Sequence, residues 1–326
     1  MNFKFSKRIA PVLLGLACAG FCFGALAQSY PSRTVRIVVP YATGGGSDVL
    51  ARQISAVLQQ TWGQGVVVDN KAGASGNIGS AEVVRAAPDG YTLLMQNSTM
   101  LTNLALTEKL PYDPFKDLTP IMLVGTAPIA VVAHPSAGIN DVKDLIAASK
   151  SKPGGFSYGS CGAGTPQHFV MELLKQKTGI PAVNISYKGC SPALNDVLAG
   201  QIPLAVVSAN LVAPHVKNGK LKVIGIASPT RYSLMPDSLT FEEQNLKPFD
   251  IANWYALMGP AKLPADVIQK IVTDVRKALD DANIQSKLTA AGVEITKASA
   301  DDLAKLIRVD AQRYTQLARS ANIKPE

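Results

Sequence analysis

A short apolar segment that runs directly into a glycine loop constrains this chain more than any other feature. Residues 37–39, Ile-Val-Val, are typical of a strand buried on both faces, and Pro40 ends it. Gly44, Gly45 and Gly46 follow, and apolar residues then recur at helical spacing over residues 49–58. The sequence therefore predicts a strand, a glycine loop and a helix in direct succession.

The start of this predicted helix has the chemistry of an anion site. Ser47 and Asp48 are candidate N-caps. Glycines allow a ligand to approach the backbone closely, and the first N–H groups of a helix have no partner within it. Because the helix dipole makes the same end positive, a loop of this kind can hold a negatively charged group.

Four interpretations of the loop remain open at this point. A nucleotide phosphate loop requires a lysine after its last glycine, and none follows Gly46. A dinucleotide fingerprint fits Gly44 and Gly46, with Asp69 as the acid further along, but Val49 occupies the position of the third glycine. The other two are a pocket for a small carboxylate and a tight connection that binds nothing.

The N-terminus has the pattern of an export signal. Lys4, Lys7 and Arg8 precede an apolar segment over residues 9–26, and Ala-Leu-Ala at 25–27 fits a small-x-small cleavage motif. A membrane anchor is the alternative, but the segment is short and is broken by proline and glycine. We expect residues 1–27 to be a signal peptide, cleaved before Gln28, and the mature protein to be secreted.

Composition limits the function classes. A chain of 326 residues with 47% apolar and 17% charged residues is a folded protein with room for two domains. The formal net charge of +8 is spread without a run of Lys and Arg, so nucleic acid is not an expected partner, whereas a small anion is compatible with it.

The opening pattern recurs in the middle of the chain. A predicted strand at 156–158 is followed by a glycine loop and by a helix with Thr165 as cap and Pro166 at its first position. His168 lies in that first turn, where local packing is the favoured interpretation and direct ligand contact the alternative. Two α/β units facing each other would form a clamp for a molecule with two anionic or polar ends.

The remaining pattern alternates strands and helices, which favours parallel sheets whose ligand crevice lies beyond the carboxyl ends of the strands. Asn97 and Ser98, at one such end, should therefore lie beside the triple glycine. Further strands are expected at residues 66–68 (as a second buried strand), 91–95, 118–124, 129–133, 182–185, 204–207, 221–227 and 254–258. Further helices are expected at residues 78–87, 265–282, 284–291 and 300–320.

Cys161 and Cys190 are the two cysteines of the mature chain. Each follows a predicted strand, and neighbouring strands of one parallel sheet would bring them within reach of a disulfide. An oxidising compartment permits this bond, and two unpaired residues packed near the cleft are the alternative. The two are too far apart in sequence for a Cys-x-x-Cys redox pair.

Signals for catalysis or a cofactor are weak. The chain has no Gly-x-Ser-x-Gly motif, and its histidines lack the spacing of a zinc site, so no metal is expected. Asp48 and Asp69 fit a cap and a strand-end turn better than a pair of catalytic carboxylates. We therefore expect a protein that is not an enzyme and holds no cofactor.

An ordered set of short motifs spans essentially the whole mature chain. The motifs are Tyr-Pro-Ser-Arg at 30–33, Ile-Val-Val-Pro-Tyr at 37–41, Gly-Gly-Gly-Ser-Asp at 44–48, Val-Asp-Asn-Lys-Ala-Gly-Ala-Ser-Gly at 68–76, Ala-Pro-Asp-Gly-Tyr-Thr-Leu at 87–93, Leu-Pro-Tyr-Asp at 110–113, Tyr-Gly-Ser at 158–160, Gly-Thr-Pro-Gln-His at 164–168 and Tyr-Lys-Gly at 187–189. This ordered set resembles the Bug-type periplasmic solute receptors of tripartite tricarboxylate transporters.

The resemblance implies an α/β protein with the two-lobed type II periplasmic-binding fold, each lobe a mostly parallel sheet flanked by helices, with the ligand cleft between them. Residues 28–127 and 228–326 would form lobe 1, and residues 128–227 lobe 2. In such receptors the loop at 41–48 grips a carboxylate through backbone N–H groups and ordered waters, and the loop at 161–168 adds contacts. The expected ligand contacts are Tyr41, Ala42, Thr43, Gly44, Gly45, Gly46, Ser47, Asp48, Asn97, Ser98, Gly162, Ala163, Gly164, Thr165, His168, Lys188, Gly189, Ser208 and Asn210.

One departure concerns the ligand. Members of the family often carry an aspartate in the loop that Ser208, Ala209 and Asn210 occupy here, so a family-typical ligand such as citrate or an acidic amino acid does not follow. The predicted function is a monomeric receptor that captures a small carboxylate and delivers it to membrane permease subunits. A nicotinamide-dependent oxidoreductase using the loop at 44–46, and a ligand sensor of the same fold without a transporter, are the alternatives.

Overall fold

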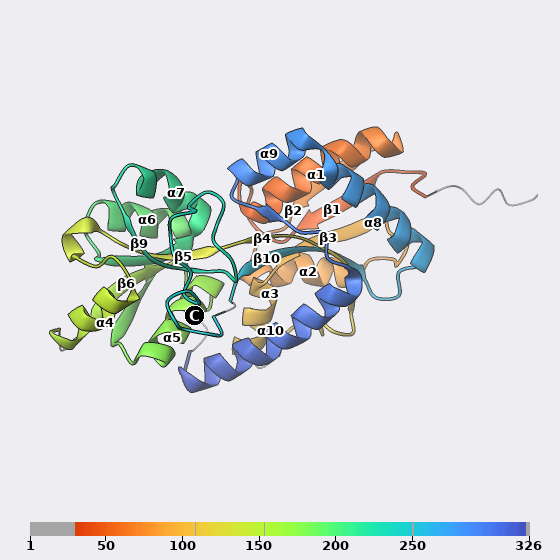
Figure 1. Cartoon of the computed structure of the whole chain (residues 1–326). Coiled ribbons are helices and arrows are strands. Elements are labelled where there is room, and N and C mark those ends of the chain that lie inside the picture. Colours follow the sequence, from red (N-terminus) through yellow and green to blue (C-terminus); the bar gives the residue numbers. More distant parts are fainter. Residues whose placement is uncertain (1–29, 108, 153, 250, 324–326) are drawn as a thin grey trace, which may run out of the picture.

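The computed structural model describes residues 30–107, 109–152, 154–249 and 251–323, so the predicted signal peptide lies outside the described residues. Two α/β lobes lie side by side, each with one sheet covered by helices on both faces (Figure 1). This arrangement confirms the predicted two-lobed α/β architecture. No helix in the described part of the chain is long and apolar enough to span a membrane.

The first lobe contains a six-stranded sheet in the order β11-β4-β10-β3-β1-β2. The strands are β1 (Val35–Val39), β2 (Val66–Asn70), β3 (Thr92–Asn97), β4 (Leu118–Ala127), β10 (Asn253–Pro260) and β11 (Glu294–Ile295). Strand β1 pairs in parallel with β2 and β3, whereas β10 is antiparallel to β3 and β4. The expectation of a mostly parallel sheet is therefore wrong for this lobe, because β10, β4 and β11 add antiparallel pairings and make the sheet mixed. Its parallel part carries the glycine loop.

The expected burial of β2 is also wrong. Strand β2 was expected to be buried on both faces because it reads Val-Val-Val. It lies at the sheet edge instead, and 48% of Val67 is exposed. A run of valines predicts a strand, but the number of its neighbours decides its burial.

The helices of the first lobe form two layers. On one face lie α1 (Gly46–Trp62), α8 (Ala265–Asp280) and α9 (Ala282–Ala290). On the other lie α2 (Asn77–Val84), α3 (Thr99–Leu106) and α10 (Ala300–Ser320). The short 3-10 turn η1 (Ala74–Gly76) precedes α2.

The second lobe contains a five-stranded sheet in the order β7-β6-β8-β5-β9. Its strands are β5 (Ile129–Ala133), β6 (Phe156–Ser160), β7 (Ala182–Ser186), β8 (Leu204–Ser208) and β9 (Lys222–Ala227). Helices α4 (Val142–Lys150) and α5 (Pro166–Thr178) cover one face, and α6 (Cys190–Leu198) and α7 (Ala209–Lys217) the other; the 3-10 turn η2 (Pro135–Ala137) follows β5. Strand β6 pairs in parallel with β7 and β8, so the starts of α5, α6 and α7 follow the same edge of the sheet.

The chain passes between the sheets at Pro128, where β4 ends and β5 begins. After β9 it stays on the second lobe. Gln244 donates to the carbonyl of Ile224 at 2.8 Å, and the N–H of Phe241 donates to the carbonyl of Ile226 at 3.0 Å. We therefore propose that the return to the first lobe lies just before β10, and not at residue 228.

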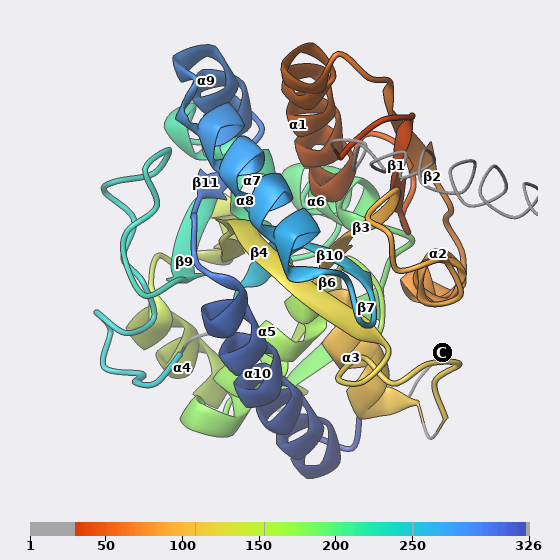
Figure 2. The ribbon, with the colours of Figure 1, turned by 90° about the vertical axis from the view of Figure 1, so that its right-hand side faces the viewer.

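Helix α10 links the lobes along the side opposite α1 and α9 (Figures 1 and 2). Its Tyr314 ring packs edge-on against Phe169 of α5, with ring centroids 5.0 Å apart. The indole N–H of Trp254 on β10 donates to Asp310 of α10 at 2.9 Å. One hydrophobic core is shared by both lobes on this side, while the side that carries α1, α6, α7 and α9 has separate cores.

Candidate ligand-binding cleft

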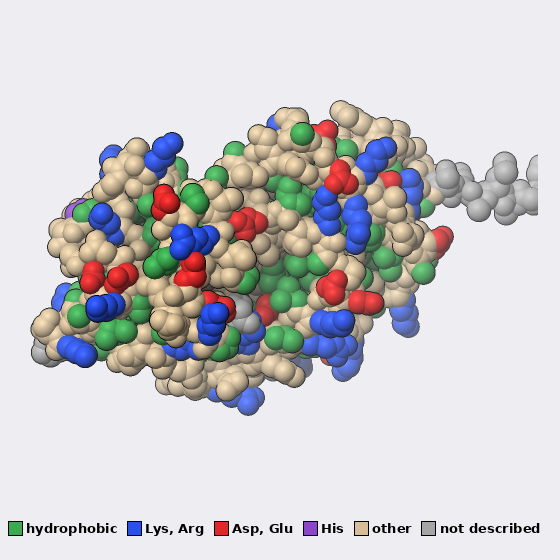
Figure 3. Space-filling view, viewed as in Figure 1, with side chains coloured by type: hydrophobic (Ala, Val, Ile, Leu, Met, Phe, Trp, Pro, Cys, Tyr) green, Lys and Arg blue, Asp and Glu red, His purple; other side chains and the backbone are tan. Residues whose placement is uncertain are grey.

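A cavity of about 610 Å³ lies between the lobes on the side where their cores are separate. The outline of the molecule is notched between the two lobes in the space-filling view (Figure 3). The first lobe contributes the glycine loop, Tyr255 of β10 and the end of α9, and the second contributes the starts of α6 and α7. The lining residues are Tyr41, Ala42, Thr43, Gly44, Gly45, Gly46, Val49, Gly189, Cys190, Ser191, Ser208, Asn210, Leu211, Tyr255 and Ala291.

The first wall is the start of α1. Gly45 is its N-cap, in extended conformation, and no side chain caps the first turn. The expectation that Ser47 or Asp48 caps the helix is therefore wrong, because both lie inside its first turn. The uncapped N–H groups of this turn lie beside the cavity that Gly44 to Gly46 line, which suits an anionic ligand group.

Asp48 shapes the loop and is not among the lining residues. Its carboxylate accepts hydrogen bonds from the N–H of Gly44 at 2.9 Å, from Asn70 at 3.0 Å and from Arg52 at 3.0 Å. Burial by itself would raise the pKa of Asp48, but the bonds from Arg52, Gly44 and Asn70 outweigh it and lower the pKa below its ordinary value. The charged carboxylate of Asp48 thus links the glycine loop to the first turn of α1 through hydrogen bonds.

Behind the glycine loop, hydrogen-bonded polar side chains fix the position of Tyr41, an aromatic residue of the cavity wall. The hydroxyl of Tyr41 donates to Gln96 at 2.6 Å, and Gln96 donates to Ser80 at 2.8 Å. Asn97 contacts Ser47 at 3.3 Å, so it lies beside the start of α1, but neither Asn97 nor Ser98 lines the cavity. Tyr41 lines the cavity, whereas Gln96, Ser80 and Asn97 position the wall without forming it.

Tyr255 is a cleft residue that sequence reasoning missed. Its hydroxyl accepts from Asn253 at 3.1 Å and lies so close to Gly46 that a Cβ built there would overlap it. Burial raises the pKa of Tyr255 to about 12, so the hydroxyl stays protonated at neutral pH and can donate to an anion. No local motif marks Tyr255, because only the pairing of β10 with β3 brings it to the loop.

The second wall consists of two further helix starts. Helix α6 begins after Gly189, whose φ of +112° suits glycine, and α7 begins after Ser208; neither N-cap provides a side-chain hydrogen bond. Asn210, expected in a loop, lies instead in the first turn of α7. Three helix starts without a side-chain cap therefore meet at one cavity, one from the first lobe and two from the second. The first N–H of α7, that of Ala209, already donates to the carbonyl of Pro128 at 2.8 Å, so α7 offers an anion the N–H groups that follow it.

The glycine loop before α5 does not line this cavity. Its residues Gly162, Ala163, Gly164 and Thr165 are not among the lining residues, and Thr165 caps α5 with its own side chain. His168 accepts from the N–H of Gly164 at 3.1 Å and lies 3.6 Å from Glu172, so its ring is held within its own lobe. Lys188, beside the cavity turn, is exposed and does not line it.

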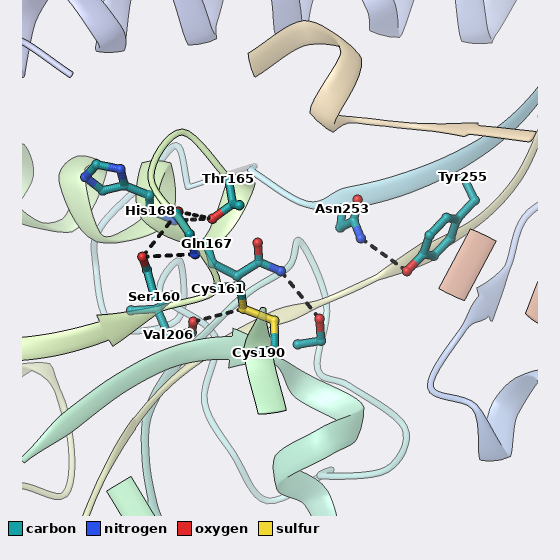
Figure 4. The surroundings of a disulfide bond; sticks show 11 residues. Ser160, Cys161, Thr165, Gln167, His168, Cys190, Val206, Asn253 and Tyr255 are labelled. Carbon is teal, nitrogen blue, oxygen red and sulfur yellow. Dashed lines mark hydrogen bonds between the residues drawn. A yellow bond between two sulfur atoms is a disulfide. The ribbon is translucent and has the colours of Figure 1, made fainter. Parts of the chain in front are cut away.

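A disulfide joins Cys161 and Cys190 next to the second wall (Figure 4). It connects the ends of the paired strands β6 and β7, and Cys190 lines the cavity at the first position of α6. The side-chain amide of Gln167 in α5 donates to the hydroxyl of Ser208 at 3.4 Å. The disulfide therefore ties the start of α6 to the loop before α5.

The geometry gives no support to a dinucleotide site. Asp69 lies on the edge strand β2, where it pairs with Arg36 at 3.1 Å and Lys71 at 3.6 Å, and it does not line the cavity. Within the described ranges, no group of His, Cys, Asp and Glu side chains is arranged to hold a metal ion.

Two lobes that enclose one cavity lined by helix starts define a solute-binding protein. The tripartite tricarboxylate transporter family receptor model matches residues 50–323, and the chain belongs to this family. It is 30% identical over 323 residues to protein BugT of Bordetella pertussis, covering 98% of this chain and 99% of BugT.

Solved structures agree with this assignment. A periplasmic transporter is 34% identical with a TM-score of 0.79, covering 90% of this chain and 99% of that one. An R. palustris protein solved with adipate is 28% identical with a TM-score of 0.80, covering 91% of this chain and 100% of that one. The predicted family and the periplasmic-binding fold are confirmed.

Proposed function

We propose that this protein is a periplasmic receptor that captures a small carboxylate in the cleft between its lobes and delivers it to the permease of a tripartite tricarboxylate-type transporter. The observation that carries the proposal is the meeting of three helix starts without a side-chain cap at one cavity. Family membership and the adipate bound by a relative of the same fold support it.

Capture uses groups from both lobes. A carboxylate at the start of α1 would accept from backbone N–H groups of Gly45 and Gly46 and from the hydroxyl of Tyr255, which are close together in the wall. The starts of α6 and α7 would contact the other end of the ligand. Because the ligand would touch both walls, it would favour the closed arrangement of the lobes.

The remaining parts of the proposal follow from this role. The signal peptide would be cleaved before Gln28, and the receptor would act as a monomer without cofactor or catalysis. Lobe 2 would extend from residue 128 to about residue 252, with the segments on either side forming lobe 1.

A thermal-shift screen of mono-, di- and tricarboxylates, followed by calorimetry, tests the proposal. A ligand present at 100 times its dissociation constant should add about 2.7 kcal/mol to the free energy of unfolding. NADH serves as the comparison compound. Stabilisation by NADH with no response to any carboxylate would overturn the proposal in favour of a dinucleotide site.

A further inference from the structure

We infer that the cleft selects carboxylates that carry no ammonium group. The inference rests on the proposed function and narrows its ligand class. Among the described residues, none of those that line the cavity bears a charge; they are glycines, apolar residues, hydroxyl-bearing residues, Asn210 and the disulfide-bonded Cys190.

The acidic side chain of the first wall does not serve a cation. Asp48 belongs to the same loop, but it is only 2% exposed and its oxygens already accept from Gly44, Asn70 and Arg52. An ammonium group in the cavity would therefore lose water without gaining a carboxylate partner, and burying an unpaired charge is strongly unfavourable.

The positive ends of the helix dipoles also disfavour an ammonium group in the cavity. Helices α1, α6 and α7 all begin at the cavity and none has a side-chain cap, so their partial positive charges add there. These charges favour a carboxylate and oppose an ammonium ion in the same space. These charges would stabilise the carboxylate of a bound amino acid and destabilise its ammonium group.

The rest of the wall suits hydrocarbon. Val49 and Leu211 contribute branched aliphatic side chains, Ala42 and Ala291 contribute methyl groups, and the disulfide adds a sulfur surface at Cys190. An aliphatic or aromatic body would bury apolar area against them. The hydroxyl and amide groups of Ser191, Ser208 and Asn210 leave room for neutral polar substituents.

Asn210 is the position at which this selectivity can be reversed. It lines the cavity from the start of α7, and an aspartate there would place a carboxylate in the wall. Its amide also bonds to Ala291 of the other lobe, so Asn210→Asp changes charge and lobe contact together. The variant Asn210→Ala loses the lobe contact without adding a charge and is the matched control.

Calorimetry with paired ligands at pH 7.5 tests the inference. The pairs are succinate and aspartate, glutarate and glutamate, adipate and 2-aminoadipate, and hexanoate and 6-aminohexanoate. In every pair of which a member binds, we expect the amine-free compound to bind at least about tenfold tighter, since an uncompensated buried charge outweighs one hydrogen bond. Asn210→Asp should narrow the ratio within a pair, and Asn210→Ala should leave it unchanged.

The outcomes separate the inference from the function on which it rests. Equal or tighter binding of the amino compounds would overturn the inference and leave a carboxylate receptor standing. A ratio that changes equally in Asn210→Asp and Asn210→Ala would also overturn it, because charge at the wall would then not set selectivity. If no compound of any pair and no carboxylate of the wider screen binds, the proposed function fails as well.

Discussion

The side-chain amide of Asn210 in α7 donates to the carbonyl oxygen of Ala291 at the end of α9, at 2.9 Å, and thereby joins the two lobes. Both residues also line the cavity. The contact is tight, because a Cβ built on the neighbouring Gly292 would overlap Asn210 and approach the hydroxyl of Tyr232 to 2.9 Å. The described arrangement of the lobes thus depends on a donor at position 210 and a glycine at position 292.

We expect Gly292→Ala to hold the lobes apart and weaken ligand binding. Gly292 has φ +78°, so alanine there carries backbone strain of about 1–2 kcal/mol in addition to its overlap with Asn210. Gly219→Ala is the control, because Gly219 has φ +68° but nothing within 4 Å of a Cβ. Small-angle scattering should show a larger radius of gyration for Gly292→Ala alone, and equal radii would contradict the prediction.

The glycine loop allows a second matched comparison. A Cβ on Gly46 would overlap the Tyr255 hydroxyl, whereas a Cβ on Gly45 would meet only the carbonyl of Ala42 at 3.7 Å. We expect Gly46→Ala to destabilise the protein by about 1–3 kcal/mol through overpacking, and Gly45→Ala to fold with little loss. Chemical denaturation measures both. Equal stability of the two variants would show that Tyr255 does not close on the loop.

Acidification should loosen the same loop through Asp48. Its pKa is lower in the folded protein than in the unfolded chain, so its contribution to stability is fully present above the unfolded value of about 3.9. That contribution is lost as the pH falls through the lower folded pKa. Thermal denaturation between pH 7 and pH 2 should show this loss, and Asp48→Asn should flatten it. Identical pH profiles for the two proteins would contradict the assignment.

The sequence predicted those parts of the cleft that are local along the chain. The strand β1, the loop at Gly44 to Gly46 and the helix α1 are consecutive, so apolar spacing and glycines suffice to place them. Tyr255 lies some two hundred residues further on and reaches Gly46 only because β10 pairs with β3. No pattern near Tyr255 indicates that pairing.

The two glycine loops of the second lobe show why similarity between loops does not predict which of them lines the cavity. The sequence before α5 resembles the loop before α1 more closely than does the turn at Gly189, yet Gly189 lines the cavity and the loop before α5 does not. Thr165 distinguishes the two kinds of helix start. Its side chain caps α5, whereas α1 and α6, which begin at the cavity, have no side-chain cap. A helix start whose N–H groups already have a partner has less to offer an anion.

The disulfide should govern both stability and affinity, because Cys190 begins a cavity helix while Cys161 anchors it to the end of β6. Closing the loop between them is expected to stabilise the folded protein by about 3–4 kcal/mol in the chain-entropy model. The double variant Cys161→Ser, Cys190→Ser should unfold at lower temperature and bind ligand more weakly, since the α6 start loses its tether. Reduced wild-type protein should behave like the double variant, which separates loss of the bond from loss of sulfur. Alkylation under denaturing conditions, followed by intact mass, checks the starting point: two labelled thiols in unreduced periplasmic protein would defeat this prediction.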